Sequence, residues 1–550
     1  MADAVEQNEE DLENDEDGEV DAEGATKRVV PLGAPDWTEL GEKQGQDPLG
    51  MQALCISLYQ SLVPGISNVT LRVRYYGFYA WLSWRYSVDV RDDSVAEWRR
   101  YLRRAEALCA LISRHANPSE GGISGSIWAR RLLRSDQDVL EFHPATDQEE
   151  GVTQYLRQDN GAFGAAYGSQ VEEIGLLEKN GENHKIPLAS KDGMEFARVY
   201  AESVGAAGEK FLKVAAAGVV SRAELTELAP MSFGYVVGAE RQAYETLLFG
   251  EPSKVSETSK RRRLTLELVL RLTGKLGREL NARDIRWAAY SGRTADGELL
   301  ELPGEVLGDH RFRWFVYHAN DLLHMAYEGL FKFTLQRLSK HPAGLRPETL
   351  LRYVVTDLVS DWADAAGTWR QLTDRLELSE DAWSKSERLS EYRLAYDVLE
   401  SAGPKAECTV EAARAAILLL AVLSKRLEPL AEQCTEVLGP SALHPYVQSL
   451  HSELRFFEQH ADVTLTSVLQ TLLTRRIIDR HLWVAFQKLR FQRGYTFLLE
   501  SQDGLLRTRK VDGPVLTNPR LESTVDFLRD IGLVERKGLT AAGRCLVETL

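Results

Sequence analysis

The sequence predicts a mainly α, multi-domain protein, and three observations lead to this prediction. The chain has 550 residues, more than one hydrophobic core holds, so we expect about three or four domains. Apolar residues recur at three- and four-residue spacing along most of the chain, which is typical of amphipathic helices. Hydrophobic and charged contents of 44% and 27% are ordinary for a globular protein.

An acidic tail, residues 1–35, begins the chain. Twelve Asp and Glu residues lie between Asp3 and Glu23, and no Lys or Arg precedes Lys27. These twelve charges account for most of the net charge of −16 and leave −4 for the remaining residues. The tail has too little apolar surface to offset the entropy of ordering, so we expect it to be disordered. It is either a solubilising leader or an anionic arm that competes with nucleic acid for a basic surface.

An aromatic stretch, residues 64–86, dominates the expected N-terminal helical domain, residues 36–145. It holds seven aromatic residues and three arginines, Arg72, Arg74 and Arg85. An exposed version would be a stacking platform for single-stranded nucleic acid. The spacing of Tyr75, Phe78, Tyr79 and later residues places one aromatic stripe on a helix, which favours a packed core. The three arginines remain open to a phosphate or an acidic partner.

Further helices are expected after this domain. Ser94, with Glu97 three residues later, predicts the start of a helix whose arginines at 99, 100, 103 and 104 lie mainly away from its buried stripe. Residues 206–263 are interpreted as a helix followed by a basic linker that starts at residue 250. A central helical domain, residues 264–474, follows. Its helices are predicted at 264–280, 311–339, 346–375, 388–401, 409–438 and 445–474.

The last expected unit, residues 475–550, begins with one helix, which a β-hairpin turning at Ser501–Gly504 follows. Its final part echoes an earlier segment, since residues 171–202 resemble residues 528–550. In each copy a helix ends at Ile-Gly-Leu, a short strand turns back at a glycine, and a last helix starts at Ser190 or Thr540. The glycines at 175 and 532 suit a helix end that needs a positive φ.

This order of elements resembles the wing half of winged helix-turn-helix domains, over about thirty residues in each copy. The resemblance implies α+β modules at about 146–205 and 520–550. It also implies phosphate contacts on the wing and base contacts on the preceding helix. Carried onto this sequence, these positions are Lys179, His184 and Lys185 in the first copy and Arg529, Arg536 and Lys537 in the second. Such modules also act as structural adaptors, and the first copy departs from the pattern because a glycine-rich, acidic segment precedes it.

A basic segment, residues 475–510, strengthens the prediction of nucleic-acid binding, with DNA as the expected ligand. Its nine basic residues outnumber its three acidic residues and give a local charge of +6. The predicted nucleic-acid-binding residues are Arg475, Arg476, Arg480, Lys488, Arg490, Arg493, Arg507, Arg509 and Lys510, with Arg536 and Lys537 from the wing. If the prediction is right, the segment forms a continuous exposed positive surface. The alternative is a solvated face whose cations pair with acids elsewhere.

Catalytic motifs are weak. Arg476-x4-His481 and Arg313-x4-His318 resemble the Rx4–6H motif of HEPN-type ribonucleases, which implies a histidine that assists attack by the RNA 2′-hydroxyl. The polar residue that usually follows the arginine is absent from both. Asp526-x8-Glu535-x-Lys537 superficially matches a restriction-nuclease core, although Asp526 is expected in mid-helix. His318, Asp321 and His324 suggest a metal, but the six-residue spacing separates the histidines around a helix, and buried polar groups with satisfied hydrogen bonds are the preferred interpretation.

The sequence therefore favours a non-enzymatic nucleic-acid-binding or scaffold protein whose long helices hold other proteins. Its texture resembles accessory proteins of bacterial genome-defence or chromosome-maintenance systems. The alternatives are a HEPN-like ribonuclease that uses Arg476 and His481, and a helical adaptor that binds only proteins. The five scattered cysteines form no metal-binding pattern, and no apolar leader or membrane-spanning run occurs, so we expect a cytoplasmic protein with no cofactor, metal or membrane partner.

Overall fold

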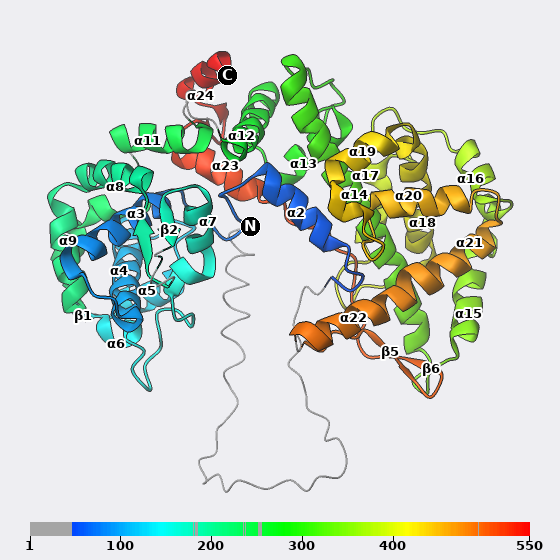
Figure 1. Cartoon of the computed structure of the whole chain (residues 1–550), viewed down its shortest axis with the longest axis horizontal. Helices are drawn as coiled ribbons and strands as arrows, with labels where there is room; N and C mark the ends of the chain where they lie inside the picture. The colour runs from blue at the N-terminus through cyan, green and yellow to red at the C-terminus, as the bar shows by residue number, and fades with distance from the viewer. Residues whose placement is uncertain are drawn as a thin grey trace, which may run out of the picture.

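The computed structural model describes residues 47–179, 181, 185–234, 236, 238–250, 256–492 and 494–550. Predictions about the acidic tail, His184 and Arg493 lie outside these residues. The described chain is mainly α-helical, which confirms the coarse fold class. Two helical lobes lie on either side of a bridge that includes α2 and α12 (Figure 1). None of the described helices is long and apolar enough to cross a membrane.

The N-terminal lobe surrounds α3 with short helices and two small antiparallel sheets, β1–β4 and β2–β3. Its α-helices are α3 (Arg74–Arg85), α4 (Val95–Ala116), α5 (Ser126–Leu133), α6 (His143–Thr146), α7 (Gly168–Glu173), α8 (Lys191–Val204), α9 (Ala206–Ala217), α10 (Arg222–Glu227) and α11 (Gly238–Phe249). Its shorter elements are η1 (Tyr86–Val90), η2 (Phe163–Tyr167), η3 (Ala229–Met231), β1 (Val139–Glu141), β2 (Leu177–Lys179), β3 (Pro187–Ala189) and β4 (Val219–Ser221).

The aromatic stretch is the core of this lobe, so its interpretation as a stacking platform is wrong. Tyr75, Tyr76, Phe78, Tyr79 and Trp81 are each at most 1% exposed. The three arginines of the stretch form ion pairs with acidic residues of the same chain. These pairs are Arg74 with Glu240 at 2.9 Å, Arg72 with Asp530 at 3.0 Å, and Arg85 with Asp89 at 2.6 Å. Burial of several aromatic side chains from one helix therefore explains the unusually aromatic composition of this stretch.

Arg103 corrects the predicted polar face of α4. Its side chain is 2% exposed and donates to the carbonyls of Thr146, Leu156 and Gln158. The guanidinium thus caps a buried loop, because its five donors can satisfy several carbonyls at once. The predicted N-cap of α4 is confirmed, since the Ser94 hydroxyl accepts from the backbone N–H of Glu97.

The C-terminal lobe is built around α14 (Gly304–Ser339), a 36-residue helix that is buried from Trp314 to Leu335. The other helices of this lobe are α13 (Ala282–Ser291), α15 (Pro347–Val359), α16 (Trp369–Arg375), α17 (Glu391–Leu399), α18 (Val410–Leu427), α19 (Ala431–Leu438), α20 (Leu450–Gln459), α21 (Leu465–Thr471) and α22 (Asp479–Gln492). The shorter elements are η4 (Ala363–Ala365), η5 (Glu428–Leu430), η6 (Pro440–Leu443), the π-helix η7 (Leu472–Ile478), β5 (Leu499–Gln502) and β6 (Leu505–Thr508). The predicted hairpin is confirmed, with Glu500 opposite Arg507.

Three of the long predicted helices are shorter pairs in the structure. The helix predicted at 346–375 ends at Val359 and resumes at Trp369, and the one at 409–438 is interrupted at Pro429, which has no N–H to continue the ladder. The helix predicted at 445–474 divides into α20 and α21. The predicted linker 250–263 is also wrong in part, because Ser256 caps α12 (Glu257–Leu276) and places Arg262 inside that helix.

The bridge combines α2 (Gln52–Leu62) and α12 with the C-terminal elements α23 (Leu521–Asp530), β7 (Val534–Glu535), β8 (Gly538–Leu539) and α24 (Ala541–Thr549). Both copies of the sequence echo form a helix, a two-stranded hairpin and a second helix. Gly175 and Gly532 adopt positive φ angles of 94° and 66°, and the hydroxyls of Ser190 and Thr540 cap α8 and α24. The likeness of these copies to winged helices stays a prediction.

Candidate nucleic-acid interface

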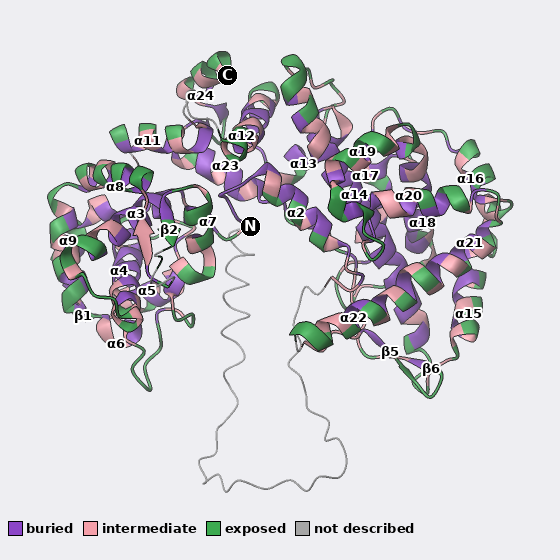
Figure 2. Cartoon of the chain, in the orientation of Figure 1, coloured by how far each residue is buried: buried purple, intermediate pink, exposed green. Residues whose placement is uncertain are grey.

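The helix α22 has a packed inner side and carries exposed aromatic rings on its outer side, at the surface of the C-terminal lobe (Figure 2). Its inner side buries His481, Val484 and Ala485. Its outer side carries Trp483, which is 38% exposed, and Phe486, which is 51% exposed. Large apolar side chains that lie exposed next to one another are typical of a contact surface.

Three residues of this outer side, Trp483, Phe486 and Arg490, follow one another at the spacing of a single helical face. Tyr446, in the loop before α20, stacks on Trp483 with ring centroids 5.7 Å apart and an interplanar angle of 8°. Phe491, 70% exposed, extends the surface at the end of α22. We call these five residues the aromatic stripe. Aromatic rings alternating with a guanidinium provide both stacking faces and a phosphate ligand.

Two guanidinium groups, one of them within the aromatic stripe, lie against its rings. The Cζ of Arg480 lies 4.8 Å from the ring centroid of Trp483, and the Cζ of Arg490 lies 5.1 Å from that of Phe491. Arg475 and Arg490 are exposed, and within the described chain neither forms an ion pair with an acid. Both arginines are therefore available to an anionic ligand, and Arg490 lies beside the ring of Phe491.

The basic segment as a whole does not form the continuous positive surface that the prediction requires. Arg480 donates to the carbonyls of Leu49, Gly50 and Tyr446, and burial lowers its pKa. Lys488 donates to the carbonyl of Asp47 at 2.8 Å. These two cations fasten the beginning of the described chain to α22. The physical reason is that a buried backbone carbonyl needs a donor as much as a phosphate does.

Two more predicted residues pair with acids. Arg476 lies 3.5 Å from Glu453 and Arg509 lies 2.5 Å from Glu500, across the hairpin. Arg507 donates to Gln502 at 3.0 Å, and Lys510 is half-buried. The wing residues Arg536 and Lys537 are exposed on the turn between β7 and β8. They lie in the bridge, whereas the aromatic stripe belongs to the C-terminal lobe (Figure 1).

His481 is a structural residue, which corrects the suggested ribonuclease motif. The ring is 0% exposed, its Nδ1 donates to the carbonyl of Pro48, and its Nε2 accepts from the N–H of Leu498. Burial lowers the pKa of His481 to about 4, with a further contribution from Lys488. Both nitrogens are therefore occupied, and neither can take a proton from a substrate. His318, of the second motif, is equally buried between Trp287 and Tyr290.

Other predicted residues also have internal partners. Asp526 is in α23, as expected, and pairs with Arg529 at 2.6 Å. Arg529 also pairs with Glu279, which removes it from the surface expected of a base-reading helix. In the first copy of the echo, Lys179 lies 3.4 Å from Glu172. The contact of Arg529 with Glu279 thus supports packing of the second copy against the rest of the chain, whereas Lys179 pairs within the first copy.

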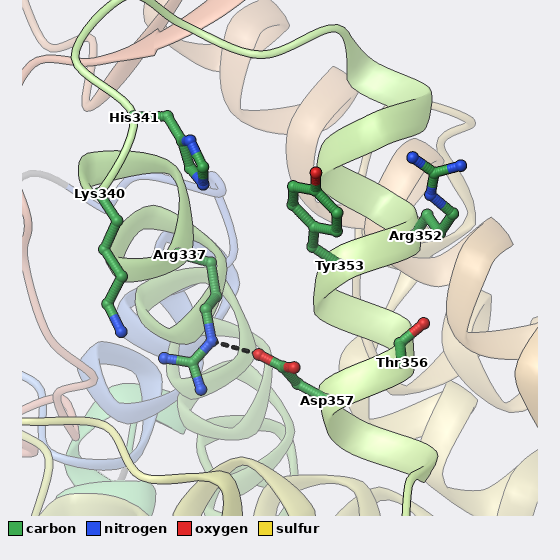
Figure 3. Close-up of a pocket in the computed structure, with 7 residues that line it drawn as sticks. All are labelled: Arg337, Lys340, His341, Arg352, Tyr353, Thr356 and Asp357. Carbon is green, nitrogen blue, oxygen red and sulfur yellow. Dashed lines mark hydrogen bonds and ion pairs between the residues drawn. The ribbon is translucent and has the colours of Figure 1, made fainter.

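A second basic feature is a pocket of about 500 Å³ between the end of α14 and α15. Figure 3 shows Tyr353 and Asp357 projecting from α15 toward Arg337, Lys340 and His341. Arg337 pairs with Asp357 at 2.5 Å, and His341 stacks on Tyr353 with ring centroids 5.9 Å apart. The pocket adjoins the β5–β6 hairpin, because Leu345 and Leu506 exchange backbone hydrogen bonds. It offers a lysine, a histidine and an aromatic face to an anionic ligand.

The aromatic stripe was missed by the sequence interpretation, which considered only the charges of residues 475–510. A signal for it is present, since Trp483 and Phe486 lie opposite the inner residues His481 and Val484 on a helical projection. The pocket residues 337–357 carry no comparable signal, because two segments separated by a loop form it. Among the described residues, Asp47, His324 and Glu328 form the group whose ligand atoms are close enough to bind a metal, all within 4.8 Å of one another.

No protein-family model, curated protein or solved structure matches this chain. Its function is therefore argued from its own residues.

Proposed function

We propose that the protein binds single-stranded nucleic acid through the aromatic stripe. The observation that carries the proposal is the exposure of Trp483 and Phe486 on a helix whose inner side is already packed. Unpaired bases stack on aromatic side chains whatever their sequence, and this stacking is worth about 1–3 kcal/mol per base. Arg490, beside the ring of Phe491, and the exposed Arg475 of η7 supply cations for the phosphate backbone.

The pocket between α14 and α15 supports the same function. Lys340 and His341 stand beside the exposed ring of Tyr353, and the neighbouring hairpin carries Arg507. In this proposal the pocket holds a phosphate group or a base further along the strand. The winged-helix-like copies act as packing modules of the bridge and of the N-terminal lobe, and the long helices of the C-terminal lobe serve as the scaffold.

A fluorescence anisotropy titration of a labelled single-stranded oligonucleotide with the full chain tests the proposal. The variant Trp483→Ala/Phe486→Ala is expected to bind roughly 5- to 150-fold more weakly for each base that it no longer stacks, the equivalent of about 1–3 kcal/mol. Affinity is expected to fall as salt increases, because phosphate neutralisation releases counterions. Circular dichroism of the variant checks that the fold is retained.

The matched control is Tyr396→Ala, which removes another exposed aromatic ring of the same lobe. Tyr396 is 49% exposed and lies under Arg393 at 5.8 Å, so it resembles the aromatic stripe in exposure and in its cation–π contact. This variant is expected to bind like the wild type. Equal affinities of the wild type and the double variant, or binding that salt does not weaken, would contradict the proposal and favour a protein-binding role for the stripe.

A further inference from the structure

The group formed by Asp47, His324 and Glu328 has two buried members and one half-exposed member, Asp47, and has no part in the proposed nucleic-acid site. His324 and Glu328 are four residues apart on α14, so both side chains lie on one face of the helix. They are 0% and 3% exposed. Asp47 reaches them from the beginning of α2, 277 residues earlier in the chain. A cavity of about 90 Å³ adjoins the group, with Asp47, Gln52, Glu328 and Asp512 in its lining.

The two buried ligand atoms meet without a hydrogen bond. Nε2 of His324 and Oε1 of Glu328 are 2.9 Å apart, but Oε1 has no hydrogen-bond partner among the described residues. The distance between these two atoms would suit a hydrogen bond, but the angle of the contact does not. Two ligands at about 2.1 Å from one ion stand about 3.0–3.4 Å apart at octahedral or tetrahedral angles. The pair therefore has the separation of two neighbouring metal ligands.

Asp47 is held rigidly as the third member. Its Oδ1 accepts from the N–H of Met51 at 2.9 Å, and its Oδ2 accepts from the N–H of Gln52 at 3.0 Å. Each carboxylate oxygen keeps a second lone pair, which leaves a ligand position directed at the cavity. The side-chain amide of Gln52 lies 3.3 Å from Nε2 of His324, and turning it over would present its oxygen to the same point.

The far side of His324 resembles the outer shell of a metal site. Its Nδ1 lies 3.5 Å from Oδ1 of Asp321, at ion-pair distance and without a hydrogen bond. Asp321 is itself fixed by Arg286 at 3.0 Å and by the N–H of Thr517 at 3.1 Å. Metal-bound histidines commonly donate their second ring nitrogen to a carboxylate, and Asp321 stands on that side of the ring. The charge of Asp321 is balanced by Arg286. Asp47 and Glu328 face one cation, Lys488, so the three side chains together carry one net negative charge toward an ion.

We propose that Asp47, His324 and Glu328 bind one divalent transition-metal ion, which fastens the start of α2 to the central helix α14. One imidazole and two carboxylates favour ions such as Zn²⁺, Mn²⁺ or Co²⁺ over Mg²⁺ and Ca²⁺, which prefer oxygen ligands alone. The role is structural, because two of the three ligands are buried and the cavity has room for little more than the ion and a few waters.

A proton on His324 is the competing way to neutralise the group. Burial opposes that charge, but Glu328 and Asp321 hold the pKa of His324 well above its usual value. Burial also raises the pKa of Glu328, although His324 opposes the shift. A protonated histidine and a bound ion exclude one another at Nε2.

Equilibrium dialysis of the full chain with Co²⁺, after removal of metals with a chelator, tests the proposal. Elemental analysis is expected to find one Co²⁺ per chain, which Zn²⁺ displaces. The variants Glu328→Gln and Asp47→Asn are expected to bind Co²⁺ at least about 10-fold more weakly, the loss that even outer partners of a metal ligand cause. Because Asp47 is half-exposed, Asp47→Asn still tests the site if the variant at the buried position, Glu328→Gln, does not fold.

The control is Glu453→Gln, which removes another buried carboxylate, on α20, that accepts from the hydroxyl of Tyr327. It is expected to bind Co²⁺ like the wild type. Less than one Co²⁺ per chain at saturating concentration, or binding that Glu328→Gln and Asp47→Asn leave unchanged, would overturn the metal site. Neither result involves nucleic acid, so it leaves the proposed function of the aromatic stripe untouched.

Discussion

At the scale of single residues, buried charged and polar side chains join distant parts of the chain. Arg74 and Glu240 form a fully buried ion pair, and Arg262 donates to the carbonyls of Leu247, Leu248 and Pro64. His481 ties Pro48 to Leu498 in the same manner. Removing one partner of such a contact leaves a buried group unsatisfied, so these residues specify how the lobes are fastened to the bridge.

His481 makes the stability of the protein sensitive to acid. Its pKa is lowered to about 4 in the folded protein, whereas an unfolded histidine titrates near 6.5. Between these values the unfolded chain binds a proton that the native chain does not bind. The free energy of unfolding is therefore expected to fall as the pH drops from 6.5 to 4, by up to about 1.4 kcal/mol per pH unit.

Urea denaturation of the wild type and of His481→Gln at several pH values between about 7 and 4.5 measures this contribution. The variant is expected to be less stable at neutral pH and to show a smaller loss on acidification. Burial raises the pKa of Glu106 to about 7 and that of Asp530 to about 6, and both groups act in the opposite direction. Because both proteins contain them, the difference between the two curves isolates His481. Parallel curves would show that His481 does not titrate as described.

At the scale of elements, the two copies of the sequence echo use the same close contact. Gly193 and Gly543 each lie in the first turn of a helix whose cap is Ser190 or Thr540. A Cβ at Gly193 would lie 1.9 Å from the carbonyl oxygen of Leu176, and one at Gly543 would lie 2.2 Å from that of Leu533. The residue just before each hairpin, Leu176 or Leu533, can approach the helix only because Gly193 and Gly543 have no side chain.

The variants Gly193→Ala and Gly543→Ala are each expected to lower the free energy of unfolding by about 1–3 kcal/mol, the usual cost of overpacking. The matched control is Gly308→Ala in α14, where an added Cβ meets nothing within 4 Å. There alanine is expected to stabilise the helix by roughly 0.5–1 kcal/mol. Melting temperatures of the three variants, compared with that of the wild type, measure these changes in stability. Equal behaviour of all three would mean that the two copies do not share this packing.

At the scale of the whole molecule, the described chain begins at α22. Asp47, the first described residue, accepts a hydrogen bond through its carbonyl from Lys488 of α22. Twelve acidic residues, between Asp3 and Glu23, precede this point in the sequence. The sequence left open which surface an anionic arm would reach, and the position of Asp47 makes α22 the nearest candidate.

Deletion of residues 1–46 is expected to tighten binding of a single-stranded oligonucleotide at low salt, because the competing charges are removed. This gain in affinity is expected to become smaller as ionic strength increases and the Debye length falls below about 10 Å. Anisotropy titrations at several salt concentrations measure it. A full-length chain with the twelve acidic residues changed to Asn or Gln separates charge from length and is expected to behave like the deletion. Identical affinities of all three chains at low salt would exclude competition by the tail.

Much of the fold follows from local sequence patterns. The recurrence of apolar residues predicts most helices, the turn at Asp503-Gly504 predicts the hairpin, and Ser94, Ser190 and Thr540 predict their caps. The aromatic stretch is correctly favoured as core because its spacing is helical. These features depend on interactions between residues close in sequence, which a linear pattern records directly.

The sequence by itself determined a mainly helical chain, a hairpin and a concentration of positive charge at residues 475–510. Only the tertiary structure decided which of those charges face solvent, since Arg480 and Lys488 bind carbonyls near residue 47 and Arg476 faces Glu453. It also brought Asp47 to His324 and Glu328. The physical reason is that the partner of a buried polar group is chosen by how distant helices pack, and no local pattern of residues contains that information.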